Sequence, residues 1–272
     1  MTVLVCLKWV AHPGEPHDER YAGASPADRA ALELALQQAA AIGTTVTAVT
    51  VGPKGADRVL RDAFAAGATR LVRVDTRADT DSTEVADAIA RVAGLCGASW
   101  VWCGDYSLDR GTGSVPAFVA AALGARQALG SIAVQIGAYT VEVTRRLDGG
   151  RRELLEVESP AVLSVEGSVA TLRRASLSAA RSATSVEVEV LSSPAGSTTA
   201  DGHAGAVVRP YRPRARALAA PPGASTLDRL RVLTDAAVAA GARGETVHLP
   251  PEDAAARIVD ALDRWGWLPV GD

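Results

Sequence analysis

Residues 143–165, VTRRLDGGRRELLEVESPAVLSV, decide the fold class of this chain. The Asp-Gly-Gly at 148–150 has the chemistry of a tight turn between two alternating segments, so it predicts an antiparallel hairpin over 139–147 and 151–157. The apolar run at 160–163 then opens with proline and is typical of a strand buried on both faces. The stretch therefore predicts a hairpin that leads directly into a buried sheet.

Short apolar runs alternate with helical patterns in the residues before this hairpin. Strands are predicted over 3–7, 46–51, 71–74 and 100–103, and helices over 27–42, 56–66, 83–95 and 114–123. Ser25 is placed as the cap of the first helix, Pro26 in its first turn and Gly43 at its end. Such alternation is typical of βαβ units, so we expect an α/β fold with a mostly parallel sheet covered by helices on both faces.

The C-terminal part of the chain differs in composition from the predicted sheet domain. After a domain over 1–190, residues 191–206 are rich in Ser, Thr, Gly and Ala without apolar periodicity, which indicates a linker. Helical patterns at 227–240 and 251–265 follow within a segment over 207–272. Because this segment has little core of its own, we expect it to pack either on the first domain or on another chain, and in the second case it is an arm that wraps a partner.

Composition and cysteine usage exclude several protein classes. The chain has 272 residues, 48% of them hydrophobic, and its net charge of -3 argues against a nucleic-acid partner. Cys6, Cys96 and Cys103 form neither a CxxC pair nor a metal-binding spacing, so they indicate reduced thiols. The apolar run at 3–7 is too short for a signal peptide or a membrane span. We expect a cytoplasmic protein that does not insert into membranes.

No catalytic or metal-binding constellation is apparent in the sequence. The four histidines form no HExxH or His/Cys ligand pattern, and no Gly-x-Ser-x-Gly nucleophile motif occurs. Paired acids such as Glu252 and Asp253 are explained by their position at the start of a predicted helix. We therefore predict neither catalytic residues nor metal ligands.

The loop at 104–115, GDYSLDRGTGSV, follows a predicted strand and precedes a predicted helix. Open α/β sheets bind ligands at the carboxyl ends of their strands, and small residues here allow a phosphate to approach the helix N-terminus. The loop is not a complete GxGxxG motif, because Pro116 takes the third glycine position. On the residues alone, a nucleotide site and a solvated turn are both open.

Residues 173–181, RRASLSAAR, place one leucine among cations and hydroxyl groups. Leu177 is consistent with a local core anchor, which is the simpler interpretation of an isolated leucine. An exposed anchor for a short-lived protein contact is the alternative.

Taken together, the hairpin turn, the 104–115 loop and the 173–181 segment resemble the beta subunits of the electron transfer flavoproteins. The resemblance extends over residues 1–190 and resumes more loosely at 207–225 and 245–268. It implies a three-layer, Rossmann-like fold of the adenine nucleotide alpha hydrolase type, with an added antiparallel hairpin and a C-terminal arm. It also implies an electron-carrier subunit without its own catalytic centre.

The resemblance implies an adenine-nucleotide site that holds AMP or a second FAD. Carried over position by position, this site falls on Cys6, Ser25, Val51, Gly104, Asp109, Gly113, Ser114 and Val115. Relatives commonly have Asp-x-Asp followed by Gly-Gln, whereas this chain has Gly111 and Ser114 at the second acid and the amide. Arg110 offers a phosphate a counter-charge that the relatives lack.

The resemblance also implies protein partners and a shared flavin. An alpha subunit would hold most of the FAD, and the loop at 9–14 would close one side, with Trp9 and His12 as open candidates for the flavin contact. A recognition loop over 173–181 would carry Leu177, ringed by Arg173, Arg174 and Arg181. Electrons would come from a flavin or nicotinamide dehydrogenase and pass to a quinone oxidoreductase or another acceptor.

Two other functions are alternatives to this one. A stand-alone adenine-nucleotide-binding regulatory protein of the universal-stress-protein type would need neither the hairpin at 148–150 nor the C-terminal arm. A nucleotide-cleaving enzyme such as an ATP pyrophosphatase would need a Ser-Gly-Gly phosphate loop near the first strand, which the sequence lacks.

Overall fold

The computed structural model describes residues 2–11, 20, 22–78, 80–137, 139–193, 225–233 and 247–265. The chain divides into two units, Met1–His203 and Ala204–Asp272. The first unit contains a nine-stranded sheet. The described part of the second contains the helices α6 (Thr226–Leu233) and α7 (Pro251–Arg264).

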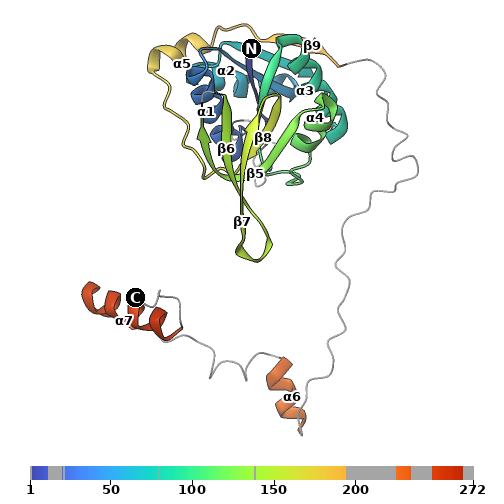
Figure 1. Ribbon diagram of the computed structural model, residues 1–272. Helices are drawn as coiled ribbons and strands as arrows, with labels where there is room; N and C mark the ends of the chain where they lie inside the picture. Colours follow the sequence, from blue (N-terminus) through green and yellow to red (C-terminus); the bar gives the residue numbers. More distant parts are fainter. Residues whose placement is uncertain are drawn as a thin grey trace. The chain divides into compact units, whose positions relative to one another are not determined.

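The order of strands in the sheet is β7-β6-β5-β8-β4-β1-β2-β3-β9. The strands are β1 (Thr2–Cys6), β2 (Val46–Gly52), β3 (Arg70–Asp75), β4 (Ala98–Gly104), β5 (Arg126–Ile136), β6 (Thr140–Arg146), β7 (Arg152–Glu158), β8 (Ala161–Val165) and β9 (Glu189–Ser192). Pairing is parallel from β9 to β5, whereas β6 pairs antiparallel with both β5 and β7. The predicted α/β class, with a mostly parallel sheet and an added hairpin, is confirmed (Figure 1).

Helices cover both faces of the sheet, which makes three layers (Figure 1). The helices α1 (Pro26–Ala41) and α2 (Asp57–Ala66) share one apolar cluster with the sheet, and α3 (Ser82–Cys96) and α4 (Val115–Leu123) share the other. Neighbouring residues of β1 divide between the two, since Val3 and Val5 belong to the first cluster and Leu4 and Cys6 to the second. A strand that alternates between two cores is buried on both sides, which explains why its sequence is continuously apolar.

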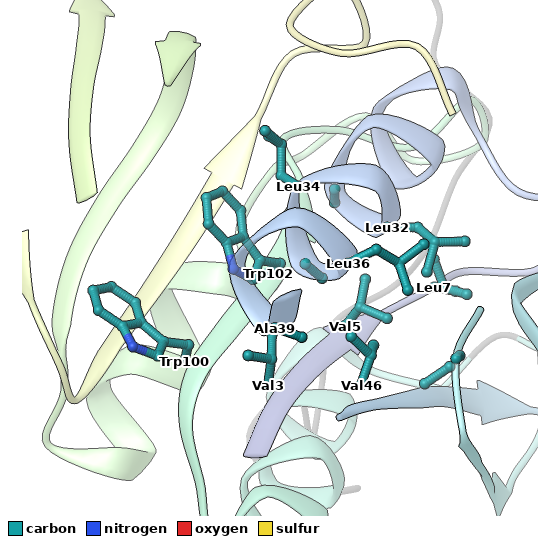
Figure 2. Close-up of a cluster of buried hydrophobic side chains, with 14 of the residues drawn as sticks. Val3, Val5, Leu7, Leu32, Leu34, Leu36, Ala39, Val46, Trp100 and Trp102 are labelled. Carbon is teal, nitrogen blue, oxygen red and sulfur yellow. The ribbon is translucent and has the colours of Figure 1, made fainter. Parts of the chain in front are cut away.

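Figure 2 shows Val3, Val5 and Trp102 gathered with the leucines of α1. The Trp102 side chain is fully buried, and its indole Nε1 donates a hydrogen bond of 2.5 Å to Oε1 of Gln38. A buried indole N–H needs such a partner, because leaving it unpaired would cost the free energy of desolvating a polar group. This bond therefore ties α1 to β4 within the apolar core.

The start of α1 follows the sequence prediction closely. Ser25 Oγ accepts a hydrogen bond of 3.0 Å from the backbone N–H of Asp28, and Pro26 is the first helical residue. The hydroxyl satisfies one of the N–H groups that the first helical turn leaves without a partner. The predicted cap of this helix is therefore confirmed.

Among the described residues of the first unit, the strands β5 and β9 and the short helix α5 (Leu177–Ala183) were not predicted. In β5 the strand pattern is interrupted near Gly130, whose φ is +67°. The pairing of β5 with β8 also shifts register there. The helix α5 packs against α2 and overlaps the segment 173–181 that was predicted as a loop. It is short enough that periodicity gives little signal.

The C-terminal predictions are covered only in part. The strand β9 crosses the boundary that was predicted between the domain ending at residue 190 and the linker beginning at residue 191. The remainder of the linker after 193 and the start of the arm lie outside the described residues. The helical pattern at 227–240 is described only as α6, whereas α7 agrees with its prediction to within one residue.

Candidate functional site

A cavity lies at the carboxyl ends of β1, β2 and β4, beside the first turns of α1, α3 and α4. From β1 the chain builds outward to β2 and β3 on one side and to β4 and β8 on the other. Such a reversal of strand order is where open α/β sheets bind ligands. The lining residues are Cys6, Leu7, Lys8, Asp28, Val49, Val51, Arg77, Ala78, Thr80, Ser82, Val85, Ile89, Cys103, Gly104, Asp105, Tyr106, Ser107, Arg110, Thr112, Gly113, Ser114, Val115 and Pro116.

The loop between β4 and α4 forms one wall of this cavity. Gly113 has a φ of +60°, and a Cβ atom there would lie 2.6 Å from the backbone oxygen of Asp105, so only glycine fits without rearrangement. The residue that follows, Ser114, stands at the N-cap position of α4, but its side chain makes no hydrogen bond to the first turn of the helix. The helix therefore presents uncapped N–H groups and its positive dipole end at the cavity, an arrangement that favours an anion.

Lys8, which follows β1, links the end of this strand to the same loop. Its Nζ donates hydrogen bonds of 2.7 and 2.6 Å to the two carboxylate oxygens of Asp109 and one of 3.3 Å to Ser107 Oγ. Partial burial would raise the pKa of Asp109, but the hydrogen bonds from Lys8 and Ser107 outweigh it and lower the pKa to about 2. This ion pair joins residues 101 apart in sequence and holds the loop beside the cavity.

Asp28, which lines the cavity, joins three elements. Its carboxylate accepts a 3.0 Å hydrogen bond from the backbone N–H of Lys8 and a further one from that of Gly104. Burial raises the pKa of Asp28 to about 6 even though these hydrogen bonds act in the opposite direction. The carboxylate thus connects the ends of β1 and β4 to the first turn of α1.

Two thiols form part of the apolar side of the cavity. A hydrogen bond with Cys103 and burial raise the pKa of the Cys6 thiol well above its ordinary value. A buried thiol whose pKa is raised in this way is a poor nucleophile and a poor metal ligand. Within the described ranges no three His, Cys, Asp or Glu side chains are grouped as metal ligands would be.

A second candidate surface lies around α5. Leu177 is the first residue of this helix, and its side chain is 77% exposed. Ser176 Oγ caps the helix through a 3.1 Å hydrogen bond from the backbone N–H of Ala179. An exposed leucine fixed at a capped helix start excludes the core-anchor interpretation of the sequence.

Arg173, just before α5, is committed to a structural contact. Its guanidinium donates two hydrogen bonds of 2.9 Å to the carboxylate of Glu33 on α1, and its backbone N–H donates a third at 3.0 Å. Burial would raise the pKa of Glu33, but these bonds lower it. Arg174 is exposed and free of ion pairs with the residues the structure describes, as is Arg181.

The family model described as "Electron transfer flavoprotein domain" matches residues 18–195. The chain belongs to this family.

Several curated relatives are similar to the chain over part of its length. The acryloyl-CoA reductase electron transfer subunit gamma of Anaerotignum propionicum is 30% identical, covering 52% of this chain and 54% of that protein. Protein FixA of Rhizobium meliloti is 31% identical over 56% of each, and the electron transfer flavoprotein subunit beta of Mycobacterium bovis is 34% identical over 59% and 62%. The chain spans about half the length of the curated relatives it matches. Several of the relatives are named as beta subunits of electron transfer flavoproteins.

The nucleotide-site residues predicted from the electron transfer flavoprotein resemblance gather largely at one place. Those that line the cavity are Cys6, Val51, Gly104, Arg110, Gly113, Ser114 and Val115. The two others are set back from it: Ser25 caps α1 beneath Asp28, and Asp109 pairs with Lys8. Their contact with a nucleotide stays a prediction.

Sequence reasoning missed further residues of the cavity wall. The polar ones outside the predicted 104–115 loop are Lys8, Asp28, Arg77, Thr80 and Ser82, whereas Asp105 falls within that loop but was given no role of its own. Each lies within a few residues of the end of a strand or the start of a helix, so a rule that collects such positions across neighbouring strands would have found them. Trp9, one of two candidates for the flavin contact, is partly buried against the core, and His12 lies outside the described residues.

No helix among the described residues is long and apolar enough to cross a membrane.

Proposed function

We propose that this chain is the beta-type subunit of an electron transfer flavoprotein, an electron carrier and not a self-contained catalyst. It would pair one to one with an alpha subunit in the cytoplasm. Electrons would enter from a flavin or nicotinamide dehydrogenase and leave to a quinone oxidoreductase or another acceptor.

The observation that carries this proposal is the extent of the family match. It covers residues 18–195, and this range includes both the loop beside the cavity and the segment around Leu177. A small exposed apolar side chain at a capped helix start suits a brief contact, because it adds a local anchor without a large buried interface. We assign Leu177, with the exposed Arg174 and Arg181, to contact with redox partners.

We assign the cavity to the adenine-nucleotide part of AMP or of a second FAD. The uncapped start of α4 and the guanidinium of Arg110 favour a phosphate. Apolar side chains such as Val49, Val51 and Ile89 offer a surface for a base. One cavity therefore offers groups that suit the phosphate of a nucleotide and an apolar surface that suits its base.

The FAD that carries electrons would be held mainly by the alpha subunit. When bound, the flavin supplies one-electron transfer. This chain would contribute the framework against which the partner packs, the occupied nucleotide site and the surface that docking partners touch. The loop at 9–14 would close one side of the flavin pocket.

A stand-alone nucleotide-binding protein of the universal-stress-protein type is the alternative. The β6–β7 hairpin and the exposed helix α7 argue against it, because a self-sufficient nucleotide-binding domain requires neither.

Co-expression of the chain with an electron transfer flavoprotein alpha subunit tests the proposal. We expect a yellow 1:1 complex, whereas the chain expressed alone should lack flavin. Mass spectrometry of small molecules released on denaturation should identify FAD together with AMP, or FAD in excess of one per complex. A monodisperse chain that carries a full complement of flavin without any partner would contradict the proposal.

A further inference from the structure

Asp105 is the first residue after β4 and lines the cavity. Its Oδ1 atom is buried and accepts no hydrogen bond from any described residue. Buried carboxylate oxygens nearly always have a donor, because removing such an oxygen from water without replacing its hydrogen bond is costly. Within a ligand cavity, such an atom marks a place where the ligand supplies the donor.

The charges around Asp105 specify what kind of ligand group fits there. Burial raises the pKa of Asp105, and the neighbouring carboxylate of Glu166 raises it further. Hydrogen bonds from the backbone N–H groups of Tyr106 and Asp105 lower this pKa, but by less than burial and Glu166 raise it. Glu166 lies directly after β8, the neighbour of β4 in the sheet. Glu166 does not line the cavity and lies 3.7 Å from the guanidinium of Arg146, so the unpartnered Oδ1 of Asp105 is what makes this wall acidic. Such an oxygen repels a phosphate and attracts a neutral group that donates hydrogen bonds.

The end of the cavity that favours phosphate lies next to this acidic wall. The backbone oxygen of Asp105 is so close to Gly113 that a Cβ atom there would approach it to 2.6 Å. Gly113 leads directly into Ser114 and the uncapped start of α4. A phosphate on these N–H groups therefore places the next part of a nucleotide, its ribose, beside Asp105.

We propose that Asp105 determines specificity in this cavity by accepting hydrogen bonds from the ribose hydroxyl groups of a bound nucleotide. The inference rests on the nucleotide site of the proposed function and adds the residue that selects ribose over deoxyribose. Carboxylates at the ends of strands in α/β folds bind a ribose in this manner, because two oxygens match two vicinal hydroxyls. The base would then lie along the apolar lining.

Isothermal titration of the full chain with AMP and with 2′,3′-dideoxy-AMP tests the proposal. We expect the wild-type chain to bind AMP at least about tenfold more tightly, the effect of one hydrogen bond to a charged acceptor. Asp105→Ala should bring the two affinities to within about twofold of each other, chiefly by weakening AMP. Asp105→Asn, which keeps the shape and one acceptor, should give an intermediate ratio and remains informative if the alanine variant does not fold.

Asp62→Asn is the matched control. Burial also raises the pKa of this carboxyl, but it lies on α2 and outside the cavity lining, so the AMP preference should be unchanged. Equal affinity of the wild-type chain for the two nucleotides would overturn the role of Asp105 while leaving the nucleotide site intact, and would indicate that water alone pairs with Oδ1. A preference that survives in Asp105→Ala would assign the ribose to another residue. Binding of neither nucleotide would overturn this inference together with the nucleotide site.

Discussion

The helices α1 and α7 are built alike but have opposite surroundings. Both begin with proline, at Pro26 and Pro251, and they have 16 and 14 residues. Eleven residues of α1 are buried, whereas α7 buries none, and Ile258 and Val259 on it are more than half exposed. Helix formation is thus a local property of each sequence, but stability of a helix comes mainly from the apolar face that it buries.

The comparison indicates what each helix is for. The first turn of α1 organises the cavity through Asp28, so its burial serves the chain's own site. The apolar face of α7 has no such role in its own unit, and the arm is expected to bury it against the alpha subunit. Leu177 on α5 belongs with α7 in this respect, because its side chain is also left exposed.

The largest effect is expected from a charge placed on α7. Ile258→Asp should weaken association with the alpha subunit about a hundredfold, the cost of losing a central apolar contact, without lowering the melting temperature of the chain alone. Sedimentation or calorimetric titration of the co-purified subunits measures the first and a thermal melt the second. Glu252→Ala, at the exposed start of the same helix, serves as the control. A complex that assembles equally well with both variants would remove α7 from the interface.

The buried side of the comparison is tested by Gly104→Ala. A Cβ atom at this position would collide with Asp28, coming within 2.9 Å of its backbone nitrogen. We expect a loss of about 1–3 kcal/mol in the free energy of unfolding, measured with urea, because a well-packed site must move to admit the methyl group. Gly94→Ala is the matched control, since a Cβ there meets nothing within 4 Å and alanine is favoured in a helix. Similar free energies of unfolding for Gly104→Ala and Gly94→Ala would show that the end of β4 and Asp28 move apart at little cost.

Leu177→Ala separates docking from folding on the exposed side. Removing a side chain that is 77% exposed creates no cavity, so the melting temperature and flavin content of the complex should be nearly unchanged. Electron transfer from the cognate dehydrogenase should fall about tenfold, as expected for loss of a contact worth about 1–2 kcal/mol. In contrast, Leu163→Ala in the core should cost about 2–5 kcal/mol of stability while activity per folded molecule is retained. A destabilised Leu177 variant with normal kinetics would remove the recognition assignment.

The smallest effect is expected from the ion pair between Lys8 and Asp109. A double-mutant cycle with Lys8→Gln and Asp109→Asn should give a coupling of about 0.5–1 kcal/mol at pH 7, because both side chains are partly exposed. The folded-state pKa of Asp109 is lowered to about 2, so its stabilising contribution is complete above the unfolded pKa and is lost as the pH falls through the folded value. The coupling measured by urea unfolding should therefore be smaller at pH 3 than at pH 7, and an increase on acidification would contradict this role.

Much of the fold could be predicted because its signals are local. The continuous apolar pattern of β1, the cap at Ser25 and the Asp-Gly-Gly turn each act within a few residues. The elements that escaped prediction lack such signals: β5 is interrupted at Gly130, and β9 and α5 are too short for periodicity. For the site, the 104–115 loop was found because its position after a strand and its glycines follow a general rule of parallel sheets.

The sequence by itself determined the βαβ order, the hairpin and the region of the cavity, since hydrophobic period and turn chemistry need only neighbouring residues. Only the tertiary structure decided which side chains meet. Lys8 and Asp109 pair across 101 positions, and Arg173 reaches Glu33 across 140. The exposure of Leu177 and the buried, unpaired oxygen of Asp105 are likewise visible only in three dimensions. The physical reason is that a parallel sheet aligns the carboxyl ends of strands that lie far apart in the chain, and no local pattern encodes those distances.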